Sequence, residues 1–243
     1  MPLLDYNSLR EMLEKLGERY TKMLEIDVDS GKDEELFKWL LASILYGSFL
    51  PEKIATRTYL EFRKRGVLTP QAILNAGWEG LVEILDSGGY VRLDFKTAYK
   101  LSEVSKNLIK WYDGSLNKLH EKAQDSLDLE NRIKALGKGV GHVTTCIFLR
   151  ELREVWPKAD PSLTKLEILA ASNLGLISSK DPRQAVQELR NFWERNKVPG
   201  FNFISFETAI LRLGKDYCKK SLCKNCFLSQ YCVTSRQQYF HKK

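Results

Sequence analysis

The sequence has no segment in which apolar and polar residues alternate with a period of two over a useful length, so it predicts no β-sheet. It has no uninterrupted apolar run of ~18 residues, which a membrane-spanning helix needs. It also lacks an N-terminal apolar stretch typical of a signal peptide, and internal repeats and low-complexity tracts are absent. We therefore expect no membrane partner and a cytoplasmic location, or a nuclear one in a eukaryote, where thiols stay reduced.

What the sequence does contain is a series of short amphipathic segments. Apolar residues recur at helical spacing, and proline or a capping residue stands at many segment ends, as in Thr69-Pro70 and Asp181-Pro182. With 43% hydrophobic and 28% charged residues among 243, the chain has enough apolar mass for a core. The segments predicted to be helical are 8–24, 33–44, 52–65, 70–76, 77–85, 95–112, 127–136, 143–152, 161–171, 182–193 and 203–213.

A glycine-rich turn separates two of these helical segments. Three glycines occur in five residues, in the order Gly137, Lys138, Gly139, Val140, Gly141. A turn of this kind that opens a helix leaves backbone N–H groups unpaired at the positive end of the helix dipole, where they suit a phosphate. The net charge of +7 also suits a polyanion without proving one. An ordinary helix connection with a glycine cap explains the turn equally well.

Four of the five cysteines lie close together near the C-terminus. Their spacing is Cys218-x4-Cys223-x2-Cys226-x5-Cys232, and a cluster that contains Cys-x2-Cys typically binds a metal. Ligation by sulfur alone fits a [4Fe–4S] cluster or a structural zinc, and spacing alone does not separate them. Cys146 stands apart in a helical segment and is most simply a buried small residue.

Together these motifs resemble a known family. Gly139-Val140-Gly141, a helix, and then Asp160 at 17 residues after Val143 are similar to the helix-hairpin-helix (HhH-GPD) DNA glycosylases of the endonuclease III superfamily of base-excision repair. The four-cysteine tail follows in the family's order. Two departures are visible. Gly137-Lys138 replaces the usual Leu-Pro before Gly139, and the first cysteine interval is two residues shorter than the family's.

The resemblance implies an all-α fold with two helical lobes that flank a DNA-binding cleft. One domain would span residues 33–154 and contain the hairpin, and the other would combine 1–32 with 155–234, followed by a tail at 235–243. It implies a [4Fe–4S] cluster on Cys218, Cys223, Cys226 and Cys232, with structural zinc as the runner-up. The expected partner is double-stranded DNA with a damaged or mispaired base, bound by a monomeric, nucleoid-associated protein. The hairpin from Gly137 through His142 would contact the DNA.

The resemblance also suggests how the reaction proceeds. Asp160 occupies the position of the family's catalytic carboxylate, although an Asp before Pro-Ser is also good helix-cap chemistry. Bifunctional relatives carry a lysine where this chain has Val143, so we expect a monofunctional glycosylase that uses water. Two alternatives stay open. One is a glycosylase with AP-lyase activity that uses Lys138, and the other is a non-catalytic iron–sulfur module that binds DNA.

The sequence gives the least information about the base pocket. The resemblance places Tyr46, Ser48, Tyr90 and Val143 at the pocket or at a wedge that enters the duplex. Tyr46 suits a core position at a helix end equally well, and the glycine loop before Tyr90 could be a surface turn. The candidate substrates are hypoxanthine, uracil or thymine in a mismatch, and alkylated purines.

Overall fold

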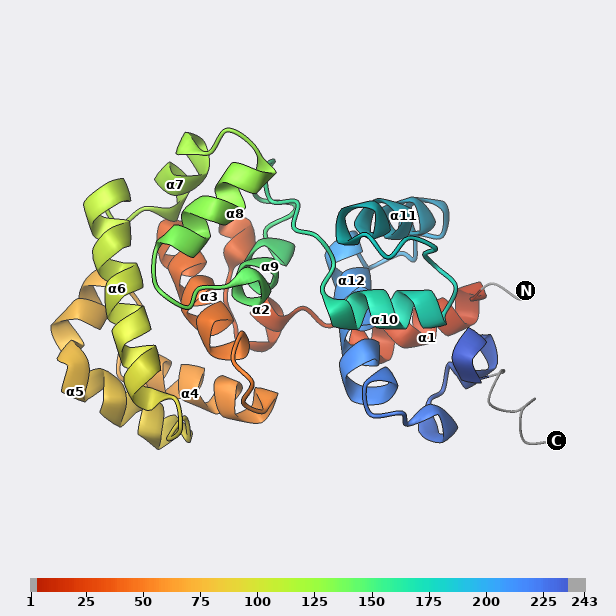
Figure 1. Ribbon diagram of the computed structural model, residues 1–243, viewed down its shortest axis with the longest axis horizontal. Helices are drawn as coiled ribbons and strands as arrows, with labels where there is room; N and C mark the ends of the chain where they lie inside the picture. The colour runs from red at the N-terminus through yellow and green to blue at the C-terminus, as the bar shows by residue number, and fades with distance from the viewer. Residues whose placement is uncertain (1–3, 236–243) are drawn as a thin grey trace. The chain divides into compact units, whose positions relative to one another are not determined.

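The computed structural model describes residues 4–235, and these residues form helices and no strand (Figure 1), which confirms the all-α prediction. They divide into two compact units, one of residues Thr21–Pro161 and a terminal unit that combines residues up to Tyr20 with those from Ser162 onward. The sequence placed these junctions at 32/33 and 154/155. Of the tail predicted at 235–243, residues 236–243 lie outside the part of the chain that the structure describes. None of the described helices is long and apolar enough to cross a membrane.

The Thr21–Pro161 unit is built around a buried helix, α3, which carries nine buried residues and packs against α4, α7 and α9. The Trp39 indole N–H donates to the carbonyl of Phe148 at 3.0 Å and so ties α3 to α9. The short α2 (Tyr20–Met23) crosses the junction between the units. The other elements are η1 (Val28–Ser30), α3 (Asp33–Tyr46), α4 (Glu52–Lys64), α5 (Pro70–Gly88), α6 (Asp94–Tyr112), α7 (Leu116–Lys122), α8 (Ser126–Ala135) and α9 (His142–Arg150).

Helix α5 begins as the sequence predicts. The Thr69 hydroxyl accepts the N–H of Ala72, and Pro70 occupies the first helical position. The helix is broken at Gly77, which has φ 67° and ψ 174°, a conformation open essentially to glycine alone. At its C-terminal end α5 approaches α4 so closely that a Cβ atom at Gly88 would lie 2.4 Å from the Cα atom of Thr58. This contact requires glycine.

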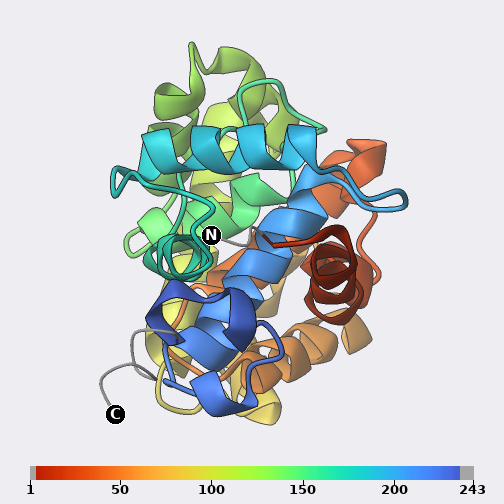
Figure 2. The same ribbon diagram turned by 90° about the vertical axis from the view of Figure 1, so that its right-hand side faces the viewer.

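The terminal unit is organised around α12, which packs against α1, α10 and α11. Figure 2 shows α12 in blue with α1, in dark red, alongside it. Helix α12 is buried on almost every side, and Phe206 at its centre stacks on Trp193 at 5.3 Å between ring centroids. The elements are α1 (Tyr6–Leu16), α10 (Lys165–Asn173), α11 (Pro182–Arg195), α12 (Phe203–Leu213), η2 (Gly214–Cys218), η3 (Cys223–Asn225) and η4 (Ser229–Tyr231).

The largest differences from the predicted helix boundaries are at two places, and α7 was not predicted. The single helix expected over 8–24 is wrong, because α1 ends at Leu16 and Gly17 follows it. A Cβ atom at Gly17 would lie only 3.2 Å from the carbonyl oxygen of Ser205, so glycine allows this close packing on α12. The helix expected from Pro161 begins at Lys165 instead, because Thr164 and Glu167 form a capping box there.

Candidate functional site

The glycine-rich turn predicted from the sequence joins α8 to α9 and forms a tight hairpin. The N–H of Val140 donates to the carbonyl of Gly137 at 3.0 Å, and Gly139 has φ 87°. A positive φ at the third residue of a four-residue turn is typical of type II geometry, which favours glycine. The helix-hairpin-helix arrangement is therefore present, and the Gly139 position requires its glycine.

The hairpin is held against α6 by packing and by two hydrogen bonds. A Cβ atom at Gly137 would lie 2.7 Å from a methyl group of Val104, so only glycine fits this contact. The Asn107 amide donates to the carbonyl of Leu136 at 2.9 Å. The N–H of Lys138 donates to the Glu103 carboxylate at 2.5 Å. Helix α6 thus fixes the start of the turn and leaves Gly139 and Gly141 exposed, whereas the Val140 side chain between them is buried.

Exposed residues at the end of the hairpin and the start of α9 present unpaired donors. Among the described residues, no hydrogen-bond acceptor reaches the backbone N–H groups of Gly139, Gly141, His142 or Val143. Gly141 precedes the first residue of α9 and has no side-chain cap. A Cβ atom there would meet nothing within 4 Å, so the protein's own packing does not require glycine at this position. The open N-terminal end of α9 is therefore a site that an anion can approach closely.

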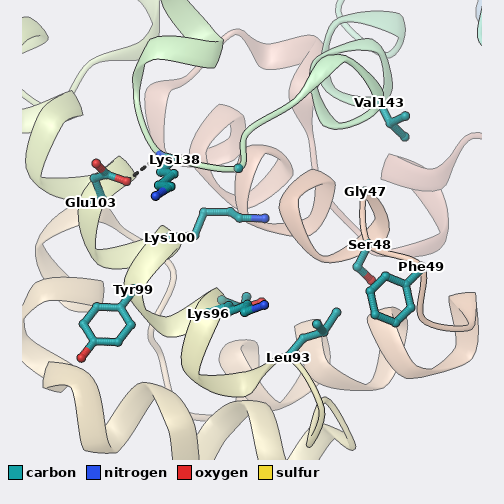
Figure 3. Close-up of a pocket in the computed structure, with 12 residues that line it drawn as sticks. Gly47, Ser48, Phe49, Leu93, Lys96, Tyr99, Lys100, Glu103, Lys138 and Val143 are labelled. Carbon is teal, nitrogen blue, oxygen red and sulfur yellow. Dashed lines mark hydrogen bonds between the residues drawn. The ribbon is translucent and has the colours of Figure 1, made fainter.

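A cleft of about 970 Å³ opens beside the hairpin within the Thr21–Pro161 unit (Figure 3). Three segments line it: the loop after α3, one face of α6, and the hairpin with the first turn of α9. Figure 3 shows Lys100 pointing from α6 into the space between the hairpin and that loop. The lining residues are Gly47, Ser48, Phe49, Leu93, Lys96, Thr97, Tyr99, Lys100, Glu103, Lys138, Gly139 and Val143.

The cleft carries more positive than negative charge. Lys96, Lys100 and Lys138 line it together with one carboxylate, Glu103. The Lys100 side chain is partly buried, and burial lowers the pKa of its ammonium group. A Cβ atom at Gly139 would lie 3.0 Å from Cε of Lys100, which places this lysine directly beside the exposed Gly139 of the hairpin. An anion bound at the hairpin would therefore also meet a cation.

Two of the four residues predicted for a base pocket or wedge line this cleft. Ser48 and Val143 are part of it, and Val143 is 51% exposed. Tyr46 is not among the lining residues, and its hydroxyl lies 2.7 Å from the Thr56 hydroxyl, which ties the end of α3 to α4. Gly47 lets the loop reach α9, because a Cβ atom there would lie 2.2 Å from Oγ1 of Thr144.

The prediction of Tyr90 as a pocket or wedge residue is wrong. Its side chain is fully buried, and its hydroxyl donates to the carbonyl of Leu45 at 2.8 Å. Burial raises the pKa of Tyr90 to about 12. The tyrosine therefore anchors the loop after α5 to the core, and a side chain in this position cannot enter a duplex.

Sequence reasoning missed Phe49 and the two lysines of α6. Phe49 lines the cleft and is 81% exposed, more than any other large apolar side chain among the described residues. Lys96 and Lys100 are four residues apart and so lie on one face of α6. The spacing of these lysines was readable in the sequence, but their proximity to the hairpin depends on how α6 packs.

Asp160 is held by an arginine and does not cap a helix. Its carboxylate accepts from Arg153 at 2.5 Å, and the same guanidinium donates to the carbonyl of Pro161 at 2.7 Å. The Arg153 side chain is 3% exposed, whereas that of Asp160 is 53% exposed. The cap interpretation of Asp160 is wrong, since α10 begins later and Thr164 is its cap. The buried arginine instead fixes an exposed carboxylate.

His142 and Cys146 lie one turn apart on α9. The Cys146 thiol is buried and lies 3.5 Å from a ring nitrogen of His142, whose own side chain is exposed. His142 is thus exposed at the start of α9, and Cys146 is the buried small residue expected.

The four C-terminal cysteines lie in the loops that follow α12. A Cβ atom at Gly214 would lie 2.2 Å from the carbonyl oxygen of Leu166, so η2 packs tightly on α10. Burial, followed by the nearby thiols of the other three cysteines, raises the pKa of Cys218 to about 11. Within the described residues, no three Cys, His, Asp or Glu side chains are grouped closely enough to hold a metal ion.

Comparison with known proteins supports the fold assignment. No family model and no curated protein matches the sequence. The structure resembles a trapped endonuclease III–DNA covalent intermediate in an estranged-adenine complex, with a TM-score of 0.51 and 17% identity over 98% of this chain and 100% of that one. It also resembles the H. pylori 3-methyladenine DNA glycosylase MagIII bound to 1,N6-ethenoadenine, with a TM-score of 0.51 and 14% identity over 88% of this chain and 98% of that one.

The chain has the endonuclease III fold. The resemblance read from the hairpin, Asp160 and the cysteines is thereby confirmed at the level of the fold.

The contact between Glu103 and the hairpin generates a first prediction. Because its carboxylate occupies the N–H of Lys138, it adds a negative charge beside the candidate phosphate site. Glu103→Gln should tighten binding to undamaged duplex by roughly 2- to 5-fold, the effect expected of one exposed like charge. Fluorescence anisotropy at two salt concentrations measures this, and the gain should shrink at high salt.

Glu121→Gln on α7 is the matched control for Glu103→Gln, since it removes the same charge from an exposed residue that does not line the cleft. Equal gains from both variants would show that only net charge matters and that Glu103 has no special relation to the hairpin.

Proposed function

We propose that this protein is a DNA N-glycosylase of base-excision repair. The observation that carries the proposal is the hairpin with its unpaired N–H groups beside a lysine-lined cleft. Such donors recognise phosphate without regard to base sequence, so they suit a protein that must inspect any DNA. The structural likeness to two DNA glycosylases supports the same reading. The candidate substrates remain hypoxanthine, uracil or thymine in a mismatch, and alkylated purines, which a panel of single-lesion duplexes would separate.

Phe49 has a role in this proposal. An enzyme that acts on a base inside a duplex must first extrude it, which leaves a gap in the stack. An apolar side chain inserted into that gap keeps the duplex open. Phe49 is exposed at the edge of the cleft, opposite the hairpin in Figure 3, on the loop for which the resemblance suggested this role. It replaces Tyr90 as the wedge candidate.

Asp160 supplies the chemistry. In base release, the bond between the sugar C1′ atom and the base nitrogen breaks, and the base leaves with the electron pair. The sugar becomes positively charged, and a fixed carboxylate stabilises that charge. Water then bonds to C1′, and its proton passes to a carboxylate acting as base. Arg153 would keep Asp160 oriented throughout, because its guanidinium also holds the Pro161 carbonyl.

Asp160→Asn should therefore abolish most activity and leave binding nearly intact. Asparagine still offers an oxygen to Arg153, but it has no charge to stabilise the sugar cation. We expect base release from a lesion duplex to fall by roughly two orders of magnitude or more, measured in single turnover. Binding to the same duplex should change little.

Asp128→Asn is the control for Asp160→Asn, because Asp128 also accepts from an arginine, Arg132 at 2.9 Å, but lies on α8, away from the position that the resemblance assigns to the catalytic carboxylate. Comparable losses in the two variants, or nearly normal turnover by Asp160→Asn, would remove Asp160 from the mechanism.

We further propose that the enzyme is monofunctional. Val143 lines the cleft where bifunctional relatives carry their amine, and a valine forms no imine. Incubation with an abasic duplex and borohydride should therefore trap no covalent complex, and the abasic strand should stay intact until alkali is added. Strong trapping would favour AP-lyase activity.

If the enzyme does have AP-lyase activity, lysines that line the same cleft are the candidates for its amine. Lys138 and Lys100 both line it. If trapping occurs, Lys138→Ala and Lys100→Ala tested separately would identify the amine, with Lys138 the residue that the sequence first indicated. Trapping that survives both changes would point to another group.

We propose an iron–sulfur cluster on the cysteine loops from their donor set alone, since within the described residues these side chains are not grouped closely enough to hold a metal ion. Cys218, Cys223, Cys226 and Cys232 offer four sulfur ligands, which is the donor set of a [4Fe–4S] cubane and also of structural zinc. Cys232 is buried and the other three are partly buried, so a cluster would be shielded from water. When bound, such a group would cross-link the loops after α12 and supply no step of base hydrolysis.

Metal analysis tests this assignment directly. The purified protein should be brown and contain about four iron atoms per chain, since four thiolates match one cubane. A colourless protein with one zinc would identify the runner-up instead. Cys226→Ser should lower the metal content and the thermal stability of the terminal unit, whereas Cys146→Ser, which changes the remote cysteine, should leave the metal content unchanged.

A further inference from the structure

Three exposed aromatic side chains form a cluster on α5 and α6. The ring of Trp78 lies 5.2 Å from that of Phe95 and 6.0 Å from that of Tyr99, both centroid to centroid. Their exposed fractions are 39% for Trp78, 54% for Phe95 and 65% for Tyr99. Scattered exposed aromatics are ordinary on protein surfaces, but here Trp78 contacts both other rings, and the three form an apolar patch that calls for an explanation.

The backbone is distorted immediately before this cluster. Gly77 holds the glycine-only conformation that breaks α5, and Trp78 is the next residue. A Cβ atom at Gly77 would meet nothing within 4 Å, so close packing does not explain the glycine. The break lets the second half of α5 start in a new direction, with Trp78 in contact with the two aromatics of α6. Strained backbone of this kind tends to persist where it serves function.

Lysines alternate with the aromatic residues along α6. The sequence Phe95-Lys96-Thr97-Ala98-Tyr99-Lys100 places two aromatics four residues apart and two lysines four residues apart. Lys96, Tyr99 and Lys100 all line the cleft beside the hairpin, so the aromatic cluster is continuous with the candidate DNA-binding surface. The acidic neighbours are Glu79 beside Trp78 and Asp94 beside Phe95.

Aromatic faces beside cations favour one kind of occupant. Unpaired bases stack on exposed rings while lysines follow the phosphates, and this works for any base because every base has a flat π face. A paired duplex offers no free base faces along its side. A membrane surface would favour a broader apolar face with basic residues around it. The continuity with the cleft therefore favours single-stranded DNA.

We propose that Trp78, Phe95 and Tyr99 form a stacking platform for unpaired bases of a single strand that leaves the cleft along α6. The platform rests on the proposed DNA-binding role of the cleft, but it does not depend on base release. It would allow the protein to engage frayed or unwound DNA next to a lesion, in addition to fully paired DNA.

Binding of a labelled oligothymidine of about 12 nucleotides, long enough for a typical single-strand site, tests the platform. Trp78→Ala and Tyr99→Ala should each weaken its binding roughly 5-fold or more, as expected when one stacked base loses its ring. The loss should persist at high salt, because stacking is not screened as charge pairs are. Tyr99→Phe keeps the ring and should bind like the wild type.

Trp111→Ala is the matched control, since Trp111 is also on α6, is 41% exposed and lies outside the cluster and the cleft. It should leave oligothymidine binding unchanged. Trp78→Ala and Trp111→Ala, which change residues outside the cleft, should bind a fully paired, undamaged duplex with nearly wild-type affinity, and equal thermal melting would exclude misfolding.

Two results would overturn the proposal. One is unchanged oligothymidine binding by both alanine variants. The other is an equal loss for the paired duplex, which would make the cluster part of general DNA binding. A change in self-association on sedimentation, with oligothymidine affinity intact, would likewise identify the cluster as a protein contact and reject the platform. Because these assays measure binding to undamaged DNA, they are decided independently of whether the protein releases bases.

Discussion

The packing of the hairpin on α6 is the contact on which the candidate site depends. Gly137 brings the turn into contact with Val104, and Asn107 holds the carbonyl of Leu136. Because the first half of the turn is fixed in this way, its second half and the start of α9 project toward the cleft with their N–H groups unpaired. The same face of α6 supplies Lys96 and Lys100. One helix thus positions both the neutral donors and the cations.

The fold followed closely from the sequence because its signals are local. The absence of period-two patterns predicted an all-α chain, and Thr69-Pro70 and Asp181-Pro182 marked helix starts that the structure reproduces. The segment 95–112 is α6 to within one residue. These features depend on capping and on helical periodicity, which act over a few residues. They can be read without knowing which helices pack together.

The site was less predictable because its residues are set by packing between distant segments. Tyr90 follows two glycines and suggested a surface loop, but Gly88 lets α5 approach α4 and Tyr90 reaches the carbonyl of Leu45. Asp160 suggested a helix cap, yet the capping box four residues later prevails and Arg153 takes the carboxylate. The sequence around Tyr90 does not suggest Leu45 as its partner, and the sequence around Asp160 does not suggest Arg153. The hairpin could be predicted because it is a local motif. Asp160 and the cysteines were singled out on the same ground, and their roles stay predictions.

The close contact between Gly47 and Thr144 has a mechanical consequence. It leaves no room for a side chain between the loop that carries Phe49 and the helix that begins at the hairpin. The two segments therefore cannot slide past each other, and a displacement of one must be transmitted to the other, as in any close-packed interior. A displacement of the Phe49 loop would reach α9 through this contact. If the chain binds DNA as proposed, insertion of Phe49 into the duplex and contact of the hairpin with the backbone would therefore be coupled.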